Sequence, residues 1–506
     1  MSGAPALVEA PGAELRETNS SWVLLSGERA YKVKKPVRLP FLDQRSLAHR
    51  RELCRAELEL NQLLAPGTYL AVRALVPSGD DGLLRLAGED DPDAVDYAVE
   101  MRRFDERATL AALARDGTLR DEQLDAVAER LAAFHATARR VAAPGTPPAA
   151  LAAALARIDR NGEELLALLP DPAERARVVA QLRCAAAFAT ARAEQLAARA
   201  AAGCMRELHG DLRAEHVLPG PPVRIVDRLE FDRTLREVDT GDEVAFLAMD
   251  LTALGRPDAA RRFVAAYRTA GGDAGDDALI AWHMLHRAQV RAKVALLAAR
   301  APAAAALLRL ADRCAWRLRL PPLLVVCGPA ASGKSSLAVE LAERTGRPLL
   351  QADVVRKRLA GLPPTHRGRE EDYAPGVNRR TYEELGRLAT AAAAEHGGAI
   401  VDATFRHRAD RDAFRAALGA AAGPLFAECV VPAAVLAERA ARRLADPDRI
   451  SDATPELALH QLDTWEPLDE VPATHHHRLR ADRTPAATAD ALAAALDGTI
   501  TSGLSG

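Results

Sequence analysis

The sequence predicts an α+β domain over residues 1–318, followed by an α/β domain with a parallel sheet over residues 319–506. Three observations support this division. At 506 residues the chain is longer than one hydrophobic core usually serves. The segment Leu320-Pro321-Pro322 has the composition of a linker. After this segment, short apolar runs alternate with helical stretches, as in a parallel sheet with crossover helices.

The first domain is expected to have a small strand-rich lobe over about 1–105 and a helical large lobe over about 106–318. A Ser26-Gly27 turn separates its first two strands, and Ala65-Pro66-Gly67 ends a helix that carries Glu57 in its middle. We expect strands over 22–25, 29–34, 69–76, 82–86, 96–104 and 223–226, and a helix over 46–64.

The second domain opens with the most informative stretch of the chain. An apolar run over 323–326 is followed by GPAASGKS and a helix-compatible segment, which is the P-loop (Walker A) pattern in its strand and helix context. In such a loop backbone N–H groups surround phosphate oxygens, the lysine reaches the β- and γ-phosphates, and the hydroxyl after it can hold Mg²⁺. The predicted nucleotide-binding residues are Gly328, Pro329, Ala330, Ala331, Ser332, Gly333, Lys334, Ser335 and Ser336.

Two carboxylates follow the next predicted strands, which cover 348–352 and 399–401. Because ligands bind beyond the carboxyl ends of parallel strands, Asp402 is expected to hold Mg²⁺ or its water, with Ser335 as the second protein ligand. Asp353 is expected to accept a substrate hydroxyl proton, and Arg356 to bind an anionic substrate group. The alternative for each aspartate is a helix N-cap. The remaining strands are expected over 425–431 and 478–480.

Arginines cluster in the segment LAERAARRLADPDRISDAT. Arg439 and Arg443, with Arg442 and Arg449, could form a lid that stabilises charge on a transferring phosphoryl group, or a solvated helix face. Residues 321–495 resemble the small-molecule kinases of the P-loop class, a group related to gluconate kinase, polynucleotide kinase and zeta toxins. The resemblance rests on GPAASGKS, the D-x-x-R of Asp353 and Arg356, and VDATF.

The first domain contains a second set of residues typical of phosphoryl transfer. Only six of the 67 basic residues are lysines, and three of these fall in the segment YKVKK. The stretch LHGDLRAEHV has the offsets of a kinase catalytic loop, and Asp227 follows Asp211 by sixteen residues, at the end of a predicted strand.

These motifs resemble those of the aminoglycoside phosphotransferase superfamily, and the tandem with a P-loop kinase resembles one bacterial bifunctional family. The resemblance implies a two-lobed, protein-kinase-like fold for residues 1 to about 315. It also implies a phosphate-binding Lys32, its helix partner Glu57, a catalytic base Asp211, a metal ligand Asp227, and an adenine-contacting hinge at 96–101 that includes Glu100 and Met101.

Two departures from this pattern leave alternatives open. His216 stands where a metal-binding Asn is expected, and imidazole is a poor Mg²⁺ ligand, so either Glu215 supplies oxygen or one metal position is lost. No Gly-rich loop precedes Lys32, although Thr18 to Ser21 could cover the phosphates. The domain could therefore bind without transferring phosphate, and Lys34, on the same strand face as Lys32, could be the true partner of Glu57.

The amino-acid composition limits the classes of partner that the chain is expected to bind. A net charge of -3 and 4% aromatic residues argue against nucleic-acid binding. We expect a cytoplasmic, bifunctional, ATP- and Mg²⁺-dependent kinase with small hydroxylated substrates, no membrane partner, and six buried free cysteines. The alternatives are an amino-terminal domain that regulates an active P-loop kinase, and a polynucleotide kinase or toxin-like enzyme.

Overall fold

A computed structural model of the chain describes residues 4–10, 12–39, 42–79, 82–363, 374–418, 423–444 and 454–502. Its contacts divide the chain into two units, each made of two segments. The first unit comprises Met1–Ala156 and Ala193–Leu307, and the second comprises Arg157–Arg192 and Leu308–Gly506. None of the helices among the described residues is long and apolar enough to cross a membrane.

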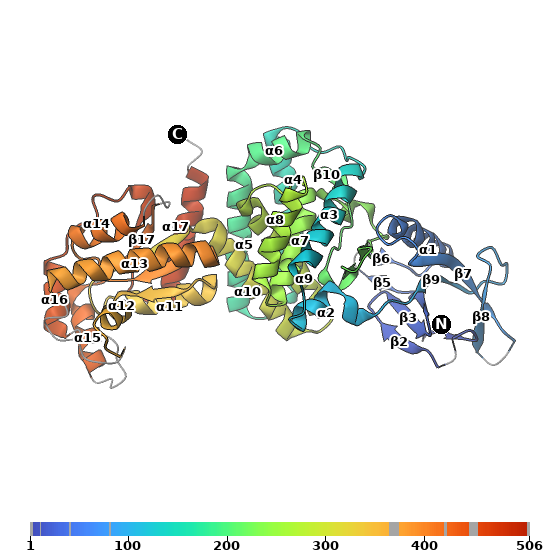
Figure 1. Cartoon of the computed structure of the whole chain (residues 1–506), viewed down its shortest axis with the longest axis horizontal. Helices are drawn as coiled ribbons and strands as arrows, with labels where there is room; N and C mark the ends of the chain where they lie inside the picture. The colour runs from blue at the N-terminus through green and yellow to red at the C-terminus, as the bar shows by residue number, and fades with distance from the viewer. Residues whose placement is uncertain are drawn as a thin grey trace. The chain divides into compact units, whose positions relative to one another are not determined.

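The first unit begins with a seven-stranded sheet in the order β1-β8-β7-β9-β4-β3-β2. Neighbouring strands are antiparallel except for β1 and β8, and α1 (Leu47–Gln62) packs against β7 and β9 (Figure 1). The predicted strands and helix are confirmed, with ends shifted by a few residues. The strands are β1 (Ala6–Leu7), β2 (Glu14–Glu17), β3 (Ser21–Ser26), β4 (Arg29–Lys34), β7 (Tyr69–Pro77), β8 (Leu83–Ala87) and β9 (Asp96–Arg102), with a separate pair β5 (Arg38–Leu39) and β6 (Leu42–Asp43).

Alternation along β4 explains how this sheet is covered. Tyr31 and Val33 join an apolar cluster with Trp22 and Leu75, whereas Ala30 belongs to a second cluster with Cys54 of α1. Because side chains alternate along a strand, Lys32 and Lys34 point to the same face as Ala30, toward α1. One face of the strand therefore supplies core residues, and the other presents two lysines to a helix.

Helices and two short ribbons make up the rest of the first unit. β10 pairs with β13 and β11 with β12, and these ribbons hold the polar loops around Asp211 and Asp227. The strand predicted over 223–226 is shorter than expected, so Asp227 lies two residues beyond it. The elements are α2 (Leu110–Arg115), α3 (Asp121–Thr137), α6 (Ala193–Ala201), β10 (Met205–Glu207), β11 (Val217–Leu218), β12 (Arg224–Ile225), β13 (Glu237–Asp239), α7 (Thr240–Ala253), α8 (Pro257–Thr269) and α9 (Asp277–Leu297).

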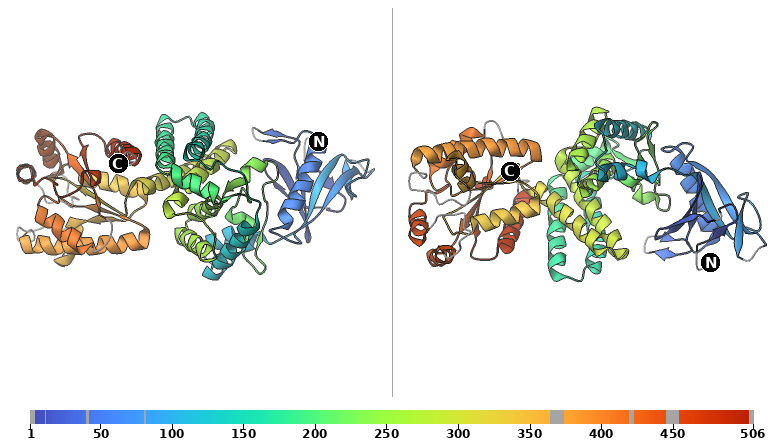
Figure 2. Two further views of the ribbon diagram at one scale, coloured as in Figure 1. Left: turned by 90° about the horizontal axis from the view of Figure 1, so that it is seen from above. Right: turned by 60° about the horizontal axis from the view of Figure 1, so that its bottom comes forward.

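The second unit is built on a five-stranded sheet that is parallel throughout, as predicted, and its strands follow the order β15-β16-β14-β17-β18. One apolar cluster contains Leu324 and Val326 of β14, and a second contains Leu323 and Val325, so both faces are covered by helices (Figures 1 and 2). The elements are β14 (Leu323–Cys327), α11 (Lys334–Thr345), β15 (Leu349–Gln351), α12 (Ala352–Leu359), α13 (Pro375–His396), β16 (Ala399–Asp402), α14 (Arg408–Ala417), β17 (Leu425–Val430), α15 (Ala433–Leu444), α16 (Pro455–Asp463), β18 (His476–Arg480) and α17 (Pro485–Ser502).

Helices that precede the Pro321-Pro322 segment also belong to the second unit. α5 (Pro172–Ala191), which follows α4 (Pro147–Leu168), contacts α17. Gln181 of α5 donates to Asp312 Oδ1 of α10 (Ala301–Arg319) at 2.6 Å, and Arg319 pairs with Asp497 of α17 at 2.7 Å. Trp316 lies in the apolar cluster of β14. The second unit therefore includes residues before 319, whereas the predicted domain boundary lies between residues 318 and 319.

Candidate functional site

The P-loop connects β14 to α11 through three residues with positive φ. Gly328, Ala331 and Gly333 have φ values of 145°, 63° and 96°, and α11 begins at Lys334. A Cβ at Gly328 would lie 2.8 Å from both the Cys429 carbonyl oxygen and Ser332 Oγ, so only glycine fits there. The loop therefore has the backbone shape that its sequence predicts, with a helix N-terminus facing its interior.

Asp402 is the last residue of β16, beside β14, and its side chain is buried in the mouth of the P-loop. Gln351 donates to its Oδ2 at 3.3 Å, whereas Oδ1 has no hydrogen-bond partner among the described residues. Burial raises the pKa of Asp402, against the opposing effects of the Lys334 ammonium and the Ser335 hydroxyl. A buried carboxylate oxygen without a protein partner, beside a hydroxyl, fits a hard divalent cation such as Mg²⁺.

Asp353 and Arg356 lie at the carboxyl end of the neighbouring strand, in the first turns of α12. Arg356 Nη1 donates to Asp353 Oδ1 at 2.6 Å, and Arg356 Nη2 donates to Asn378 Oδ1 of α13 at 3.2 Å. Asp353 is half exposed, and its charge adds to the rise in the pKa of Asp402. The structure thus brings Asp353, Arg356 and Asp402 to one edge of the sheet, as the strand order predicts.

Gln461 on α16 is a P-loop contact that sequence reasoning missed. Its Oε1 accepts the Ala330 N–H at 2.8 Å. The N–H groups of a P-loop are expected to donate hydrogen bonds to phosphate oxygens. The Gln461 amide oxygen therefore accepts from a group of the kind that would bind phosphate. Only a spatial contact across 131 residues identifies Gln461, and no local motif marks it.

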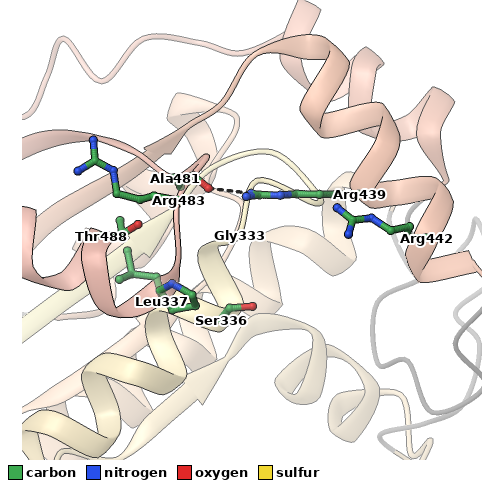
Figure 3. Close-up of a pocket in the computed structure, with 9 residues that line it drawn as sticks. Gly333, Ser336, Leu337, Arg439, Arg442, Ala481, Arg483 and Thr488 are labelled. Carbon is green, nitrogen blue, oxygen red and sulfur yellow. Dashed lines mark hydrogen bonds between the residues drawn. The ribbon is translucent and has the colours of Figure 1, made fainter. Parts of the chain in front are cut away.

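A cavity of about 340 Å³ is bounded by Gly333 at the end of the P-loop and by Ser336 and Leu337 of α11 (Figure 3). Arg439 of α15 spans it, donating to the Ala481 carbonyl at 2.8 Å and to the Ser332 carbonyl at 3.3 Å. Arg442 and Arg483 add positive charge at its rim. The side chain of Arg443, together with Arg449, lies outside the described residues. The cavity is lined by Gly333, Ser336, Leu337, Arg439, Arg442, Ala481, Arg483, Pro485 and Thr488.

Replacing Arg439 by Ala is expected to weaken nucleotide binding about tenfold, because a guanidinium fixed by two carbonyls would leave the cavity (about 1.4 kcal/mol). Arg442→Ala is the matched control. Its side chain is 70% exposed, so the loss should be much smaller. Calorimetric titration with a non-hydrolysable ATP analogue, in chains that also carry Asp227→Asn, measures both. Equal affinities for Arg439→Ala and its parent would contradict a nucleotide role for this cavity.

The second candidate site lies in the first unit, where Lys32 contacts two carboxylates. Its Nζ lies 2.7 Å from Glu57 Oε1 and 2.5 Å from Asp227 Oδ1. Asp227 has a φ of 62°, unusual for a residue with a side chain, and its N–H donates to the Tyr69 hydroxyl at 2.9 Å. Burial would raise the pKa of Asp227, but the neighbouring positive groups, Lys32 above all, together outweigh burial and lower that pKa strongly. Lys32, Glu57 and Asp227 therefore meet, as the resemblance implies.

The loop that carries Asp211 is fixed by a buried carboxylate. Glu243 of α7 accepts the N–H groups of His209 and Gly210 at 2.9 and 2.8 Å. His209 Nε2 lies 2.9 Å from the Val226 carbonyl, which ties this loop to the one that carries Asp227. Burial would raise the pKa of Asp211, but the arginine charges near it, Arg213 above all, outweigh burial and lower the pKa to about 2. Asp211 is therefore ionised at neutral pH.

Arg213 is a residue of this site that no sequence motif marks. Its Nε donates to Asp211 Oδ2 at 3.0 Å, and its Nη2 lies 2.8 Å from His216 Nε2. His216 Nδ1 lies 2.9 Å from the Asp211 carbonyl, so Nδ1 carries the proton and Nε2 is the acceptor. The imidazole lone pair is thus already used by Arg213, with Asp227 Oδ2 3.5 Å away. A metal ion at His216 would have to displace Arg213.

Glu100 and Met101 lie inside β9 rather than in a free hinge segment. β9 pairs with β4 on one side and β7 on the other, and both residues take part in each ladder. The Glu100 carboxylate binds Arg73 at 2.7 Å, and the Met101 side chain is buried. The chain leaves the sheet only after Arg102, so both residues of the expected hinge are strand residues.

A family model described as an AAA domain matches residues 323–468, a range that contains the P-loop, Asp353, Asp402 and Arg439. Uncharacterized proteins of Mycobacterium tuberculosis and Mycobacterium bovis are 34% identical to the chain over 365 residues, covering 70% of this chain and 70% of each relative. These matches extend well beyond the range of the family model, because 365 residues exceed the 146 of residues 323–468.

Solved structures show weaker similarity. A gluconokinase from Sinorhizobium meliloti is 24% identical and covers 37% of this chain and 97% of its own, with a TM-score of 0.27. An aminoglycoside 2′-phosphotransferase in complex with GDP is 16% identical and covers 61% of this chain and 92% of its own, with a TM-score of 0.34. Such TM-scores are too low to establish a common fold.

Proposed function

Since the chain belongs to the family of these mycobacterial proteins, which it matches over 70% of their length, we propose that the family consists of ATP-dependent kinases with two phosphotransferase sites. The P-loop site transfers the γ-phosphate of ATP to a hydroxyl group of a small molecule, and a second such site lies at Asp211. One observation carries the proposal: buried Asp402 Oδ1, without a partner among the described residues, lies at the mouth of a P-loop.

In the P-loop site, Lys334 and the loop N–H groups hold the β- and γ-phosphates. Asp402 and Ser335 would hold Mg²⁺, which neutralises charge on the phosphate oxygens when bound. Asp353 accepts the proton of the attacking hydroxyl through the oxygen that Arg356 leaves free, and Arg356 orients the acceptor by binding an anionic group on it. This assigns the site a small hydroxylated substrate with a negative charge.

In the amino-terminal site, Lys32 binds phosphate and Asp227 would hold the divalent cation. Asp211, with a pKa of about 2, is a weak base. It therefore orients the acceptor hydroxyl and takes its proton late, after the bond to phosphorus has largely formed. Its partner Arg213 places a permanent positive charge beside the reacting groups.

Two substitutions in the full chain, Lys334→Ala and Asp211→Ala, distinguish the activities of the two sites. Each should lower ATP consumption at its own site by about a hundredfold or more, because phosphate positioning and electrostatic stabilisation supply most of the rate. The measurement is ATP consumption with a set of hydroxylated metabolites. If both variants match the parent for every compound, the proposal fails.

The contact between Arg213 and His216 also favours a second function, in which the amino-terminal site binds nucleotide and regulates the P-loop site. A chain with Lys334→Ala that binds nucleotide tightly, but transfers no phosphate to any offered compound, would support regulation. Turnover that depends on Mg²⁺ in the same chain would refute it.

A further inference from the structure

Two lysines, not one, bind Glu57. Lys34 lies two residues after Lys32 on β4, and its Nζ contacts Glu57 Oε2, while Lys32 contacts Oε1. Glu57 is fully buried, and Lys34 is 1% exposed. Each carboxylate oxygen of Glu57 therefore has its own ammonium partner, from the same face of one strand. This settles the choice between Lys32 and Lys34: the structure pairs Glu57 with both.

A third carboxylate completes the cluster. Lys34 Nζ also contacts Glu230 Oε1, and Glu230 lies three residues after Asp227 in the same loop. The charges alternate in the order Asp227, Lys32, Glu57, Lys34, Glu230. The loop thus binds β4 twice, through Asp227 at one end and Glu230 at the other, and we call the Lys34, Glu57 and Glu230 group the inner triad.

The two ends of this chain of charges differ in burial. The side chain of Asp227 is 41% exposed and that of Lys32 is 15% exposed, whereas Glu230 is 9% exposed. Phosphate and a divalent cation would reach Lys32 and Asp227 first, and each would compete with the ion pair between them. The inner triad is closed to such ligands, so its ion pairs can persist while the outer pair separates.

We infer that Lys34 and Glu230 are positioning residues for the amino-terminal nucleotide site, an inference that rests on the proposed function of that site. The inner triad holds Glu57, and through it Lys32, in place while Lys32 and Asp227 exchange each other for phosphate and cation. Without the inner triad, nucleotide binding must itself order Glu57 and the loop over 227–230, and part of the binding free energy is lost.

The test uses the full chain with Lys334→Ala, so that the amino-terminal site dominates binding, titrated calorimetrically with a non-hydrolysable ATP analogue and Mg²⁺. Glu230→Gln is expected to raise the dissociation constant about tenfold (about 1.4 kcal/mol). Glu17→Gln is the control for the loss of an exposed ion pair next to β4, because Glu17, 61% exposed, pairs with the adjacent Lys35 at 2.6 Å and does not belong to the cluster. It should leave the dissociation constant unchanged.

A double-mutant cycle separates positioning from a purely structural role. In chains that also carry Lys32→Met, Glu57 has no phosphate-binding lysine to position, so Glu230→Gln should then have little further effect on affinity. Its effect on thermal unfolding should persist in both backgrounds. A tenfold loss that is the same with and without Lys32 would overturn the inference, as would unchanged affinity in Glu230→Gln alone.

Two further outcomes keep the test decisive. If Glu230→Gln yields little folded chain, Glu230→Asp replaces it, since the shorter side chain keeps the charge but lengthens the contact with Lys34. Glu230→Asp should also lower the affinity for the ATP analogue, by a smaller factor than Glu230→Gln, and this loss should again depend on Lys32. If the Lys334→Ala chain binds no nucleotide at all, the proposed function of this site fails together with the inference. If it binds nucleotide and the Glu230 substitutions leave the dissociation constant unchanged, only the inference is refuted.

Discussion

Asp402→Asn is expected to reduce turnover at the P-loop site by a factor of about a hundred to a thousand. The same substitution should make the ligand-free chain more stable at neutral pH. The activity falls because a neutral amide oxygen binds a divalent cation more weakly than a carboxylate does. The stability rises because the parent keeps a carboxylate buried with an oxygen that has no partner among the described residues.

The pH dependence of this effect follows from the direction of the pKa shift. Burial raises the pKa of Asp402 in the folded chain, so the folded state binds the proton more tightly than the unfolded state does. The parent therefore loses stability as the pH rises from the ordinary aspartate pKa through the raised value, and Asp402→Asn removes this loss. Urea denaturation of both chains, from acid to neutral pH and without nucleotide or Mg²⁺, measures it.

Glu428→Gln serves as the control for Asp402→Asn. Glu428 is also a buried carboxylate of the parallel sheet, but it has a protein partner, His476 Nε2, at 2.7 Å. This substitution should lower stability and leave turnover at the P-loop site largely intact. If Asp402→Asn instead lowered stability and preserved turnover, Asp402 would be a structural residue and the proposed cation site would be wrong.

A fragment that begins at residue 319 is expected not to unfold cooperatively, although it contains the complete parallel sheet. The cut removes Trp316 from the apolar cluster of β14 and removes α5, whose Ala180 carbonyl accepts a hydrogen bond from Arg319 Nη2 at 2.7 Å. Losing a buried Trp side chain alone costs about 3–5 kcal/mol, a large share of the stability of an ordinary domain. Circular dichroism during urea denaturation measures the transition.

A longer fragment and a point variant show which contacts matter. Residues 301–506 restore α10 and Trp316, so this fragment should regain a cooperative transition while remaining weaker than the full chain, which also has α5. In the full chain, Trp316→Ala should destabilise the second unit by about 3–5 kcal/mol. A fragment 319–506 as stable as the same unit in the full chain would show that these helices contribute nothing.

Features that follow from a local motif, from strand alternation or from the order of the elements could be predicted from the sequence. The spacing of GPAASGKS requires a P-loop, and the alternation along YKVKK places Lys32 and Lys34 on one strand face, where the structure has them. The order of strands and helices in the second unit predicts that Asp353 and Asp402 share one edge of the sheet. The first two predictions depend on residues close together in the chain, where local geometry fixes the outcome, whereas the third uses the general rule that parallel strands end at one edge of a sheet.

Features that depend on distant contacts could not be predicted. Gln461 reaches Ala330 across 131 residues, and Lys34 reaches Glu230 across 196. Arg213 has the ordinary spacing of a loop arginine, and only the structure shows that it takes the lone pair of His216. Likewise, helical periodicity identifies α5 as a helix but does not show that it packs against α17.

The packing of α5 against α17 has a consequence during synthesis. α5 leaves the ribosome well before its partner exists, because about 300 residues separate Ala191 from Pro485 and take ~15–60 s to translate. During this interval the face of α5 that contacts α17 lacks that partner in the nascent chain, although α10, which also bonds α5, is complete by Arg319. A chaperone that covers this face for tens of seconds, or a pause in translation, should therefore affect the yield of folded chain more than the final stability.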